Sequence, residues 1–131
     1  MIHRYSRPEM VALWTAERRF QIWLQIEILA CEARAGRGEI PQDALQTIKA
    51  NAAFDVARIE TIEHEVKHDV IAFLTSVAEH VGPDSRFIHL GMTSSDVLDT
   101  SFCIQLKEAA GILGKGLDRA MAAARQLALR H

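Results

Sequence analysis

The sequence predicts an all-α fold, with an N-terminal helical domain over residues 1–92 that leads into one long helix of a central helical bundle from residue 93 to 131. Apolar residues recur at spacings of three and four along nearly the whole chain, which is the period of a helix face. No alternating run of β-branched residues predicts a strand. From Ser95 onward no proline interrupts the helical pattern. About 35 residues at about 1.5 Å each predict a rod of roughly 50 Å.

The first two helices are predicted from capping residues and an apolar stripe. Ser6 and Glu9 form a predicted capping box, with Pro8 tolerated in the first turn. Thr15 is the predicted cap of a second helix. The apolar face of that helix is predicted to consist of Phe20, Trp23, Leu24, Ile28 and Cys31.

Glycine and proline divide the next part of the chain. Gly36 and Gly38 are predicted to end the second helix, and Pro41 opens a short helix through Ile48. Asp55 is the predicted cap of a further helix. Its apolar face is predicted to hold Val56, Ile59, Ile62 and Val66.

Around residues 67–69 the apolar pattern changes phase and becomes denser, which predicts a separate, more buried helix that ends at Gly82 and Pro83. Its apolar residues are Val70, Ile71, Phe73, Leu74 and Val77. The long helix that follows carries a broad stripe of small and apolar residues: Val97, Ser101, Ile104, Ile112, Leu117, Ala120, Ala124 and Leu127. A rod of this length needs partner helices, so we expect either a longer protein or association between subunits.

Composition limits the classes of function. The formal net charge is −2, so no basic surface suggests nucleic acid. No apolar run is long enough to span a bilayer, and the N-terminus lacks the apolar core of a signal peptide. Cys31 and Cys103 lie far apart in patterns typical of buried helix faces, which favours a reducing cytoplasm over a disulfide scaffold.

Residues 89–96 form the most informative segment. Thr93, Ser94 and Ser95 follow one another where the long helix is predicted to begin, and a helix start has unpaired backbone N–H groups and a positive dipole end. Gly91 allows a ligand to approach the backbone, and His89 changes charge near neutral pH. The segment therefore predicts a cradle for a carboxylate or phosphate. The alternative is a helix cap made by Thr93 and Asp96, and the two roles can coexist.

Several blocks together carry a family resemblance. Residues 89–100, His-Leu-Gly-Met-Thr-Ser-Ser-Asp-Val-Leu-Asp-Thr, resemble the first signature region of the fumarase/aspartase superfamily. Within it they are most similar to the adenylosuccinate lyases. Residues 4–10, followed by Trp14, resemble the N-terminus of the bacterial members, and residues 67–73 resemble their Arg/Lys-His-Asp-Val block. The likeness extends through residues 23–27.

The resemblance implies a fumarase/aspartase-like fold and a β-elimination without a cofactor or metal. Members of the family release fumarate from adenylosuccinate, giving AMP, and from the succinyl-carboxamide ribotide of purine synthesis. Their active sites are assembled from several subunits of a tetramer with a core of long helices. The chain is therefore expected to bind a small nucleotide substrate in a homotetramer, with neither nucleic acid nor membrane as a partner.

The resemblance also implies roles for residues near the N-terminus and in the middle of the chain. Arg4 and Tyr5 match positions that contact the nucleotide, and a guanidinium suits a phosphate. Lys67, His68 and Asp69 match substrate-contacting positions, and His68 has a supporting role near the catalytic acid. The alternative for Arg4 is a solvated charge, and for Asp69 an N-cap of the next helix.

In the signature region, Thr93 and Ser94 match positions that hold the carboxylate or phosphate end of the substrate. His89 and Ser95 are expected beside the site, with a hydrogen-bonded structural role as the alternative for His89. The family's principal acid, in a Gly-Arg-Thr-His-like segment, is missing, as is the mobile loop that carries the serine base. Both are expected beyond His131, so residues 1–131 alone are expected to be inactive.

Three alternatives remain. Another lyase of the superfamily, such as argininosuccinate lyase, shares the fold and the chemistry. A non-enzymatic helical interaction module would use the stripe of the long helix. Finally, His64-Glu65-Val66-Lys67-His68 matches the HExxH zinc pattern, which requires both histidines on one helix face. No third ligand follows at metalloprotease spacing.

Overall fold

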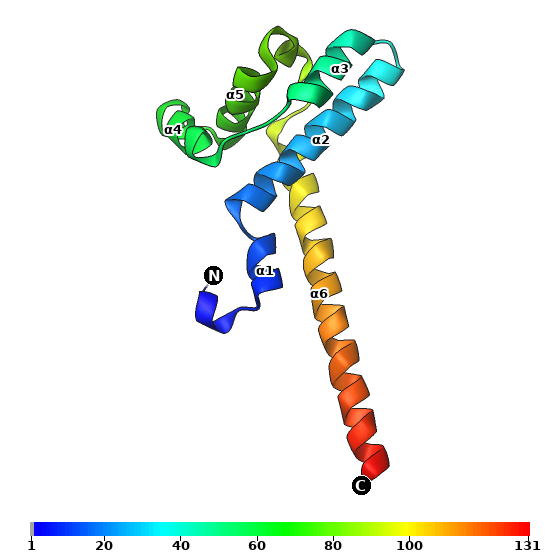
Figure 1. The fold of residues 1–131 in the computed structure, drawn as a ribbon. Helices are drawn as coiled ribbons and strands as arrows, with labels where there is room; N and C mark the ends of the chain where they lie inside the picture. Colours follow the sequence, from blue (N-terminus) through cyan, green and yellow to red (C-terminus); the bar gives the residue numbers. More distant parts are fainter. Residues whose placement is uncertain (1) are drawn as a thin grey trace.

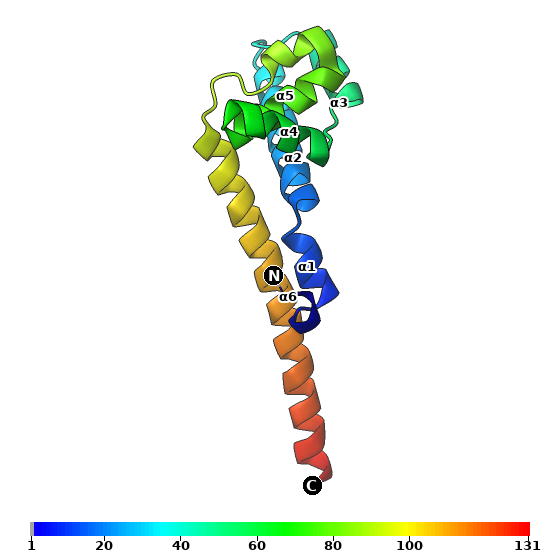
Figure 2. The same cartoon turned by 90° about the vertical axis from the view of Figure 1, so that its left-hand side faces the viewer.

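The structure, a computed structural model, describes residues 2–131 and is elongated (Figure 1). Shorter helices gather at one end, and one long helix runs away from them (Figures 1 and 2). Residues 2–131 contain no strand, so the all-α prediction is confirmed. The elements are η1 (His3–Tyr5), α1 (Pro8–Leu13), α2 (Ala16–Gly36), α3 (Gln42–Asn51), α4 (Val56–Val66), α5 (Asp69–Val81), η2 (Gly82–Phe87) and α6 (Ser94–Arg130).

The core lies where α2 packs against α3, α4 and α5. Its centre is aromatic: Phe20 stacks on Phe73 with ring centroids 5.7 Å apart, and Trp23 meets both rings edge-on. Such pairs add about 1 kcal/mol each beyond the burial of their area. The fully buried aliphatic residues around them include Ile40, Ile48, Ile59, Val70, Val77 and Val97. These contacts fix α2 as the element against which the rest is placed.

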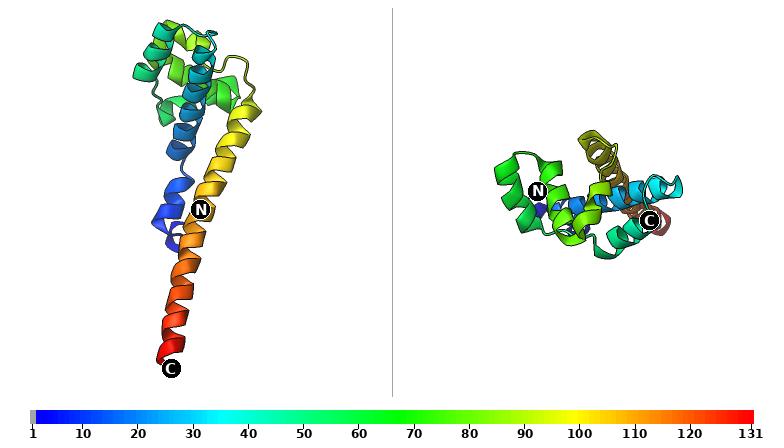
Figure 3. Two further views of the ribbon diagram at one scale, coloured as in Figure 1. Left: turned by 90° about the vertical axis from the view of Figure 1, so that its right-hand side faces the viewer. Right: turned by 90° about the horizontal axis from the view of Figure 1, so that it is seen from above.

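The first half of α6 is attached to α1 and α2 by polar contacts. The Trp23 indole donates to the Ser101 hydroxyl at 3.0 Å, and the Gln105 amide donates to the Leu13 carbonyl at 2.9 Å. Further along, the remainder of α6 extends past the other helices (Figure 3). Its predicted stripe is therefore buried at Val97 and Ser101 but exposed at residues such as Leu117 and Leu127.

Most predicted helix starts are confirmed. Thr15 accepts from the Arg18 N–H at 3.1 Å, and Asp55 accepts from the Arg58 N–H at 2.7 Å. Thr93 and Asp96 form the capping box of α6.

Two predicted caps are wrong. The capping box of Ser6 and Glu9 does not form: Arg7 occupies the N-cap position, and Pro8, whose φ is already helical, starts α1 without a side-chain cap. Asp69 is not the N-cap of α5 either. His68 takes that position, and Asp69 is the first helical residue.

Three side chains predicted on buried faces are exposed. Val66, the last residue of α4, is 44% exposed, and Ile71 on the first turn of α5 is 45% exposed, although its neighbour Val70 is fully buried. Cys103 is exposed while Cys31 is buried. Cys103 is two residues from Ser101 and Gln105, both buried, so the helical period turns it to the opposite side of α6. None of the helices in residues 2–131 combines the length and apolar character needed to cross a membrane.

Candidate functional site

The segment between η2 and α6 has an unusual backbone. His89 has φ 63° and Gly91 has φ 65°, both in the left-handed region. A non-glycine residue pays about 1–2 kcal/mol for this conformation. Within residues 2–131 only Lys67 and His89 do so, and each belongs to one of the blocks predicted to bind substrate. Such strain persists only where surrounding contacts hold it in place.

Glu27 on α2 supplies the contacts at His89. The His89 N–H donates to Glu27 Oε2 at 2.9 Å, and His89 Nδ1 lies 2.6 Å from Glu27 Oε1. The Glu27 side chain is 1% exposed. Because an ionised carboxylate only accepts, the proton of this short contact belongs on Nδ1, which leaves Nε2 as the free ring nitrogen. His89 is therefore hydrogen-bonded, as its structural alternative requires, and its expected place beside the site stays a prediction.

Two further α2 residues hold the same segment. Cys31 Sγ donates to the Phe87 carbonyl at 3.7 Å. Burial raises the pKa of the Cys31 thiol to about 11, Glu27 adds to the rise and Arg34 opposes it, so the thiol stays protonated as a donor at neutral pH. Arg34 lies against Gly91, where a Cβ atom would clash with its guanidinium. Residues 27, 31 and 34 are one helix face, so a single stripe of α2 positions the segment that precedes α6.

The start of α6 is capped. The Thr93 N–H donates to Asp96 Oδ2 at 2.7 Å, and its hydroxyl donates to the same oxygen at 3.1 Å. These two bonds, the backbone one first, lower the pKa of the Asp96 carboxyl. The cap interpretation is thus confirmed for Thr93. In the described part of the chain, no hydrogen bond engages the hydroxyls of Ser94 and Ser95, which remain free donors at the helix start.

The block at residues 67–69 forms the corner between α4 and α5. Lys67 ends α4 with φ 55°, and His68 Nδ1 accepts the Ile71 N–H at 3.3 Å. Nδ1 is therefore unprotonated, and the ring presents Nε2 to solvent. Asp69 Oδ1 accepts from the Val70 N–H at 2.7 Å. Both side chains are well exposed, so they are available to a ligand despite their local bonds.

This corner also removes the helical basis of the HExxH interpretation. α4 ends at Val66, so His64 lies on α4 and His68 caps α5. The two imidazoles do not share a helix face. Among residues 2–131 no group of three or more His, Cys, Asp or Glu side chains is placed to hold a metal ion.

The N-terminal block lies elsewhere. The Arg4 guanidinium covers the Tyr5 ring, 4.7 Å from its centroid, and Tyr5 is 75% exposed. Tyr5 lines a hollow of about 440 Å³ against Ile112 of α6. Ser94 precedes Ile112 by 18 residues, which is about 27 Å along the helix. The chain thus keeps Arg4 and Tyr5 apart from Thr93 and Ser94, and no hydrogen bond or ion pair of residues 2–131 joins the three blocks.

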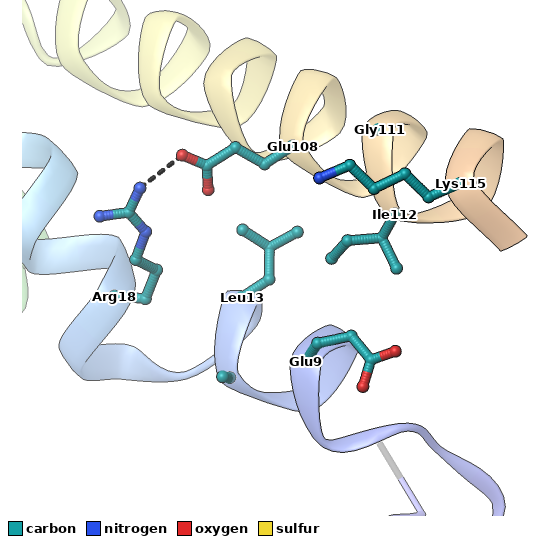
Figure 4. A pocket seen from close by; sticks show the side chains of 8 residues that line it. Glu9, Leu13, Arg18, Glu108, Gly111, Ile112 and Lys115 are labelled. Carbon is teal, nitrogen blue, oxygen red and sulfur yellow. Dashed lines mark hydrogen bonds and ion pairs between the residues drawn. The ribbon is translucent and has the colours of Figure 1, made fainter.

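A groove of similar size, about 470 Å³, lies between α1 and α6 (Figure 4). None of the predicted site residues lines it. Arg18 and Glu108 face each other across its end, and this ion pair ties α2 to α6 (Figure 4). The groove therefore belongs to the packing contact of α6 with α1 and α2, and it is not formed by the residues predicted to bind substrate.

Glu27 is the residue that the sequence interpretation left without a role. Its position carried a signal: it lies four residues after Trp23 and four before Cys31, in the middle of the apolar face of α2. A carboxylate on a buried face requires a hydrogen-bonding partner. The partner itself, 62 residues away in sequence, was not visible from that pattern.

The fold is similar to that of the solved fumarate lyase from Mesorhizobium sp. BNC1, with a TM-score of 0.76 at 23% identity, over 85% of this chain and 28% of the other. A family model described as "Lyase" matches residues 3–131. The chain belongs to this lyase family.

Curated relatives point to one member of that class. The adenylosuccinate lyase of Bacillus subtilis (strain 168) is 48% identical over 131 residues, and that of Synechocystis sp. is 50% identical over the same length. The adenylosuccinate lyase of Streptococcus mutans is 43% identical. Each of these matches covers all of this chain and 30% of the relative, so the chain spans under a third of their length.

Proposed function

We propose that this chain is part of an adenylosuccinate lyase. The observation that carries the proposal is identity of 43–50% across the whole chain to relatives of that name. The proposed reactions are the release of fumarate from adenylosuccinate, giving AMP, and from the succinyl-carboxamide ribotide. The proposed cellular location is the cytoplasm, which suits the two free cysteines.

The chemistry explains which parts of the site this chain would provide. A β-elimination needs a base for the proton next to a carboxylate, an acid for the leaving nitrogen, and donors for the charge that builds on the carboxylate. The start of α6 suits the third task, because Ser94 and Ser95 offer free hydroxyls beside the positive end of a 37-residue helix. Thr93 has its hydroxyl on Asp96 and contributes mainly by placing that helix start.

Two other blocks take the remaining proposed roles. Arg4 and Tyr5 would contact the nucleotide, with the Arg4 guanidinium on phosphate and the exposed Tyr5 ring available for stacking. Lys67 and Asp69 would contact substrate. His68 would support the catalytic acid, since its unprotonated Nδ1 is held by α5 and its Nε2 is free to donate.

The separation of these blocks supports a shared site. Tyr5 lies beside the middle of α6 and Ser94 lies at its start, so one copy does not enclose a nucleotide between them. We propose that copies associate along α6, as a homotetramer, and that residues 93–131 are the beginning of its central bundle domain. The principal acid and base would come from outside residues 1–131, which on their own would be inactive.

The test is an ultraviolet assay on the protein expressed from its complete reading frame, with adenylosuccinate and argininosuccinate as parallel substrates. Conversion of adenylosuccinate to AMP and fumarate would support the proposal. Turnover of argininosuccinate alone would retain the superfamily and change the substrate. Silence on both would remove the proposal and favour an interaction module. Residues 1–131, purified to a defined mass, are assayed in parallel, and turnover by them would contradict the expectation that they are inactive on their own.

A further inference from the structure

Glu27 is an unexpected residue for its position. Its neighbours along the face of α2 are Trp23 and Cys31, both buried, and the carboxylate is itself 1% exposed. A buried charge costs several kcal/mol in desolvation, and an apolar side chain of similar volume often stabilises a fold as well or better. Stability of the core therefore does not explain a carboxylate here.

Both oxygens of Glu27 are used on one residue. Oε2 accepts from the His89 backbone N–H at 2.9 Å, and Oε1 faces His89 Nδ1 at 2.6 Å. The first bond holds the backbone in its left-handed conformation, and the second fixes the rotation and tautomer of the ring. A single side chain thus determines where His89 Nε2 points.

The imidazole ring of His89, which Glu27 holds, lies beside the segment that is proposed to bind a carboxylate. His89 is four residues before Thr93, and its side chain is 18% exposed, so the ring is covered except for a limited part. The free ring nitrogen thus belongs to a residue that lies close in sequence to the helix start that carries Ser94 and Ser95.

We infer that Glu27 is a positioning residue of the lyase site: it fixes the orientation and tautomer of His89, so that Nε2 serves the substrate carboxylate or phosphate at the start of α6. The inference rests on the proposed function. Glu27 itself touches no substrate, and its effect passes entirely through His89.

The experiment is a double-mutant cycle in the full-length protein, with E27Q, H89Q and the double variant assayed for kcat and KM. E27Q is expected to lower kcat/KM by roughly 10- to 100-fold, the range seen when a histidine in a metal site loses its hydrogen-bonding partner. H89Q should change the same parameter, kcat or KM, as E27Q does. In the H89Q background, E27Q should change kcat/KM by less than about twofold.

The matched control is E32Q. Glu32 lies on the same helix, but its carboxylate pairs with Lys49 at the surface, so its loss should change kcat/KM by less than about twofold. Amide hydrogen exchange gives a readout independent of turnover: residues 87–92 should exchange faster in E27Q and at the parental rate in E32Q. Should E27Q not accumulate as folded protein, E27D is the second variant. E27D keeps the carboxylate but shortens the side chain by one methylene. It should lower kcat/KM less than E27Q does, and this loss should also vanish in the H89Q background.

Losses from E27Q and H89Q that multiply would overturn the inference, and so would parental kinetics in either single variant. A parent that is active on adenylosuccinate or argininosuccinate, with an equally active E27Q, removes the inference alone. A parent silent on both substrates removes the proposed function and this inference with it.

Discussion

Three glycines provide a graded test of how α2 holds the segment before α6. Gly36 has an ordinary φ and open space around its Cβ position. Gly38 has φ +76° and open space. Gly91 has φ +65°, and the Arg34 guanidinium also lies against its Cβ position. Alanine at position 36 therefore adds only a methyl group. At position 38 it also adds backbone strain, and at position 91 it adds both backbone strain and a steric clash.

The expected magnitudes follow from these geometries. G36A should be neutral or stabilise by up to about 1 kcal/mol, because alanine favours the helix over glycine. G38A should cost about 1–2 kcal/mol for the left-handed conformation. G91A carries the same cost and must also displace Arg34 from its ion pair with Glu39, at 2.5 Å, which adds up to about 1 kcal/mol.

The assay is denaturant unfolding of the full-length protein, followed by circular dichroism at one fixed protomer concentration, since association shifts apparent stability. R34A alone already loses the ion pair with Glu39, so G91A/R34A is compared with R34A, and the loss between these two variants should match the loss of G38A against the parent. The reasoning is refuted if G91A is as stable as G36A, or if its loss is unchanged when Arg34 is removed.

Two other predictions concern buried polar groups of α2. S101A removes the acceptor of the Trp23 indole and should lower the free energy of unfolding by about 1–3 kcal/mol, measured by denaturant unfolding. The control S95A, at an exposed position, should lower it by less than about 0.5 kcal/mol. Equal effects of the two substitutions would contradict the buried bond. The Cys31 thiol has its pKa raised from 9.0 to about 11, so its contribution to stability is complete below pH 9 and is lost as the pH rises toward 11. The unfolding free energy of the parent should fall more steeply across this window than that of C31A, and parallel pH curves for the two proteins would show that Cys31 does not titrate in this way.

Local chemistry made most of the helices predictable. Thr15, Asp55 and Thr93 each accept or exchange hydrogen bonds within three residues, so their caps depend on neighbours that the sequence shows directly. The N-cap of α5 is His68 and not Asp69, for which a cap was one of two expected roles, and an imidazole is a less common N-cap. Sequence patterns do not resolve such a shift of one residue.

Contacts between distant residues were much less predictable. Glu27 and His89, like Trp23 and Ser101, meet only after α2, α5 and α6 have packed, and no periodicity of one helix specifies the partner. The exposure of Cys103 has the same origin, since a stripe of small and apolar residues does not say which side of α6 faces α2. The family resemblance located the three blocks, whereas their separation came only from the structure.

The exposed part of the long helix and one block of the proposed site lie along the same stretch of α6. Polar anchors hold α6 as far as Glu108, and beyond it Leu113, Leu117 and Met121 are each more than 60% exposed. Burying each of these side chains would contribute about 1.5–3 kcal/mol, which is a strong drive for helices to pack along this stretch. Tyr5 lies against the same stretch, at Leu113. Partner helices that cover these three side chains would therefore pass close to Tyr5. The proposed association would complete the bundle and, in the same step, bring binding residues of another copy to Tyr5.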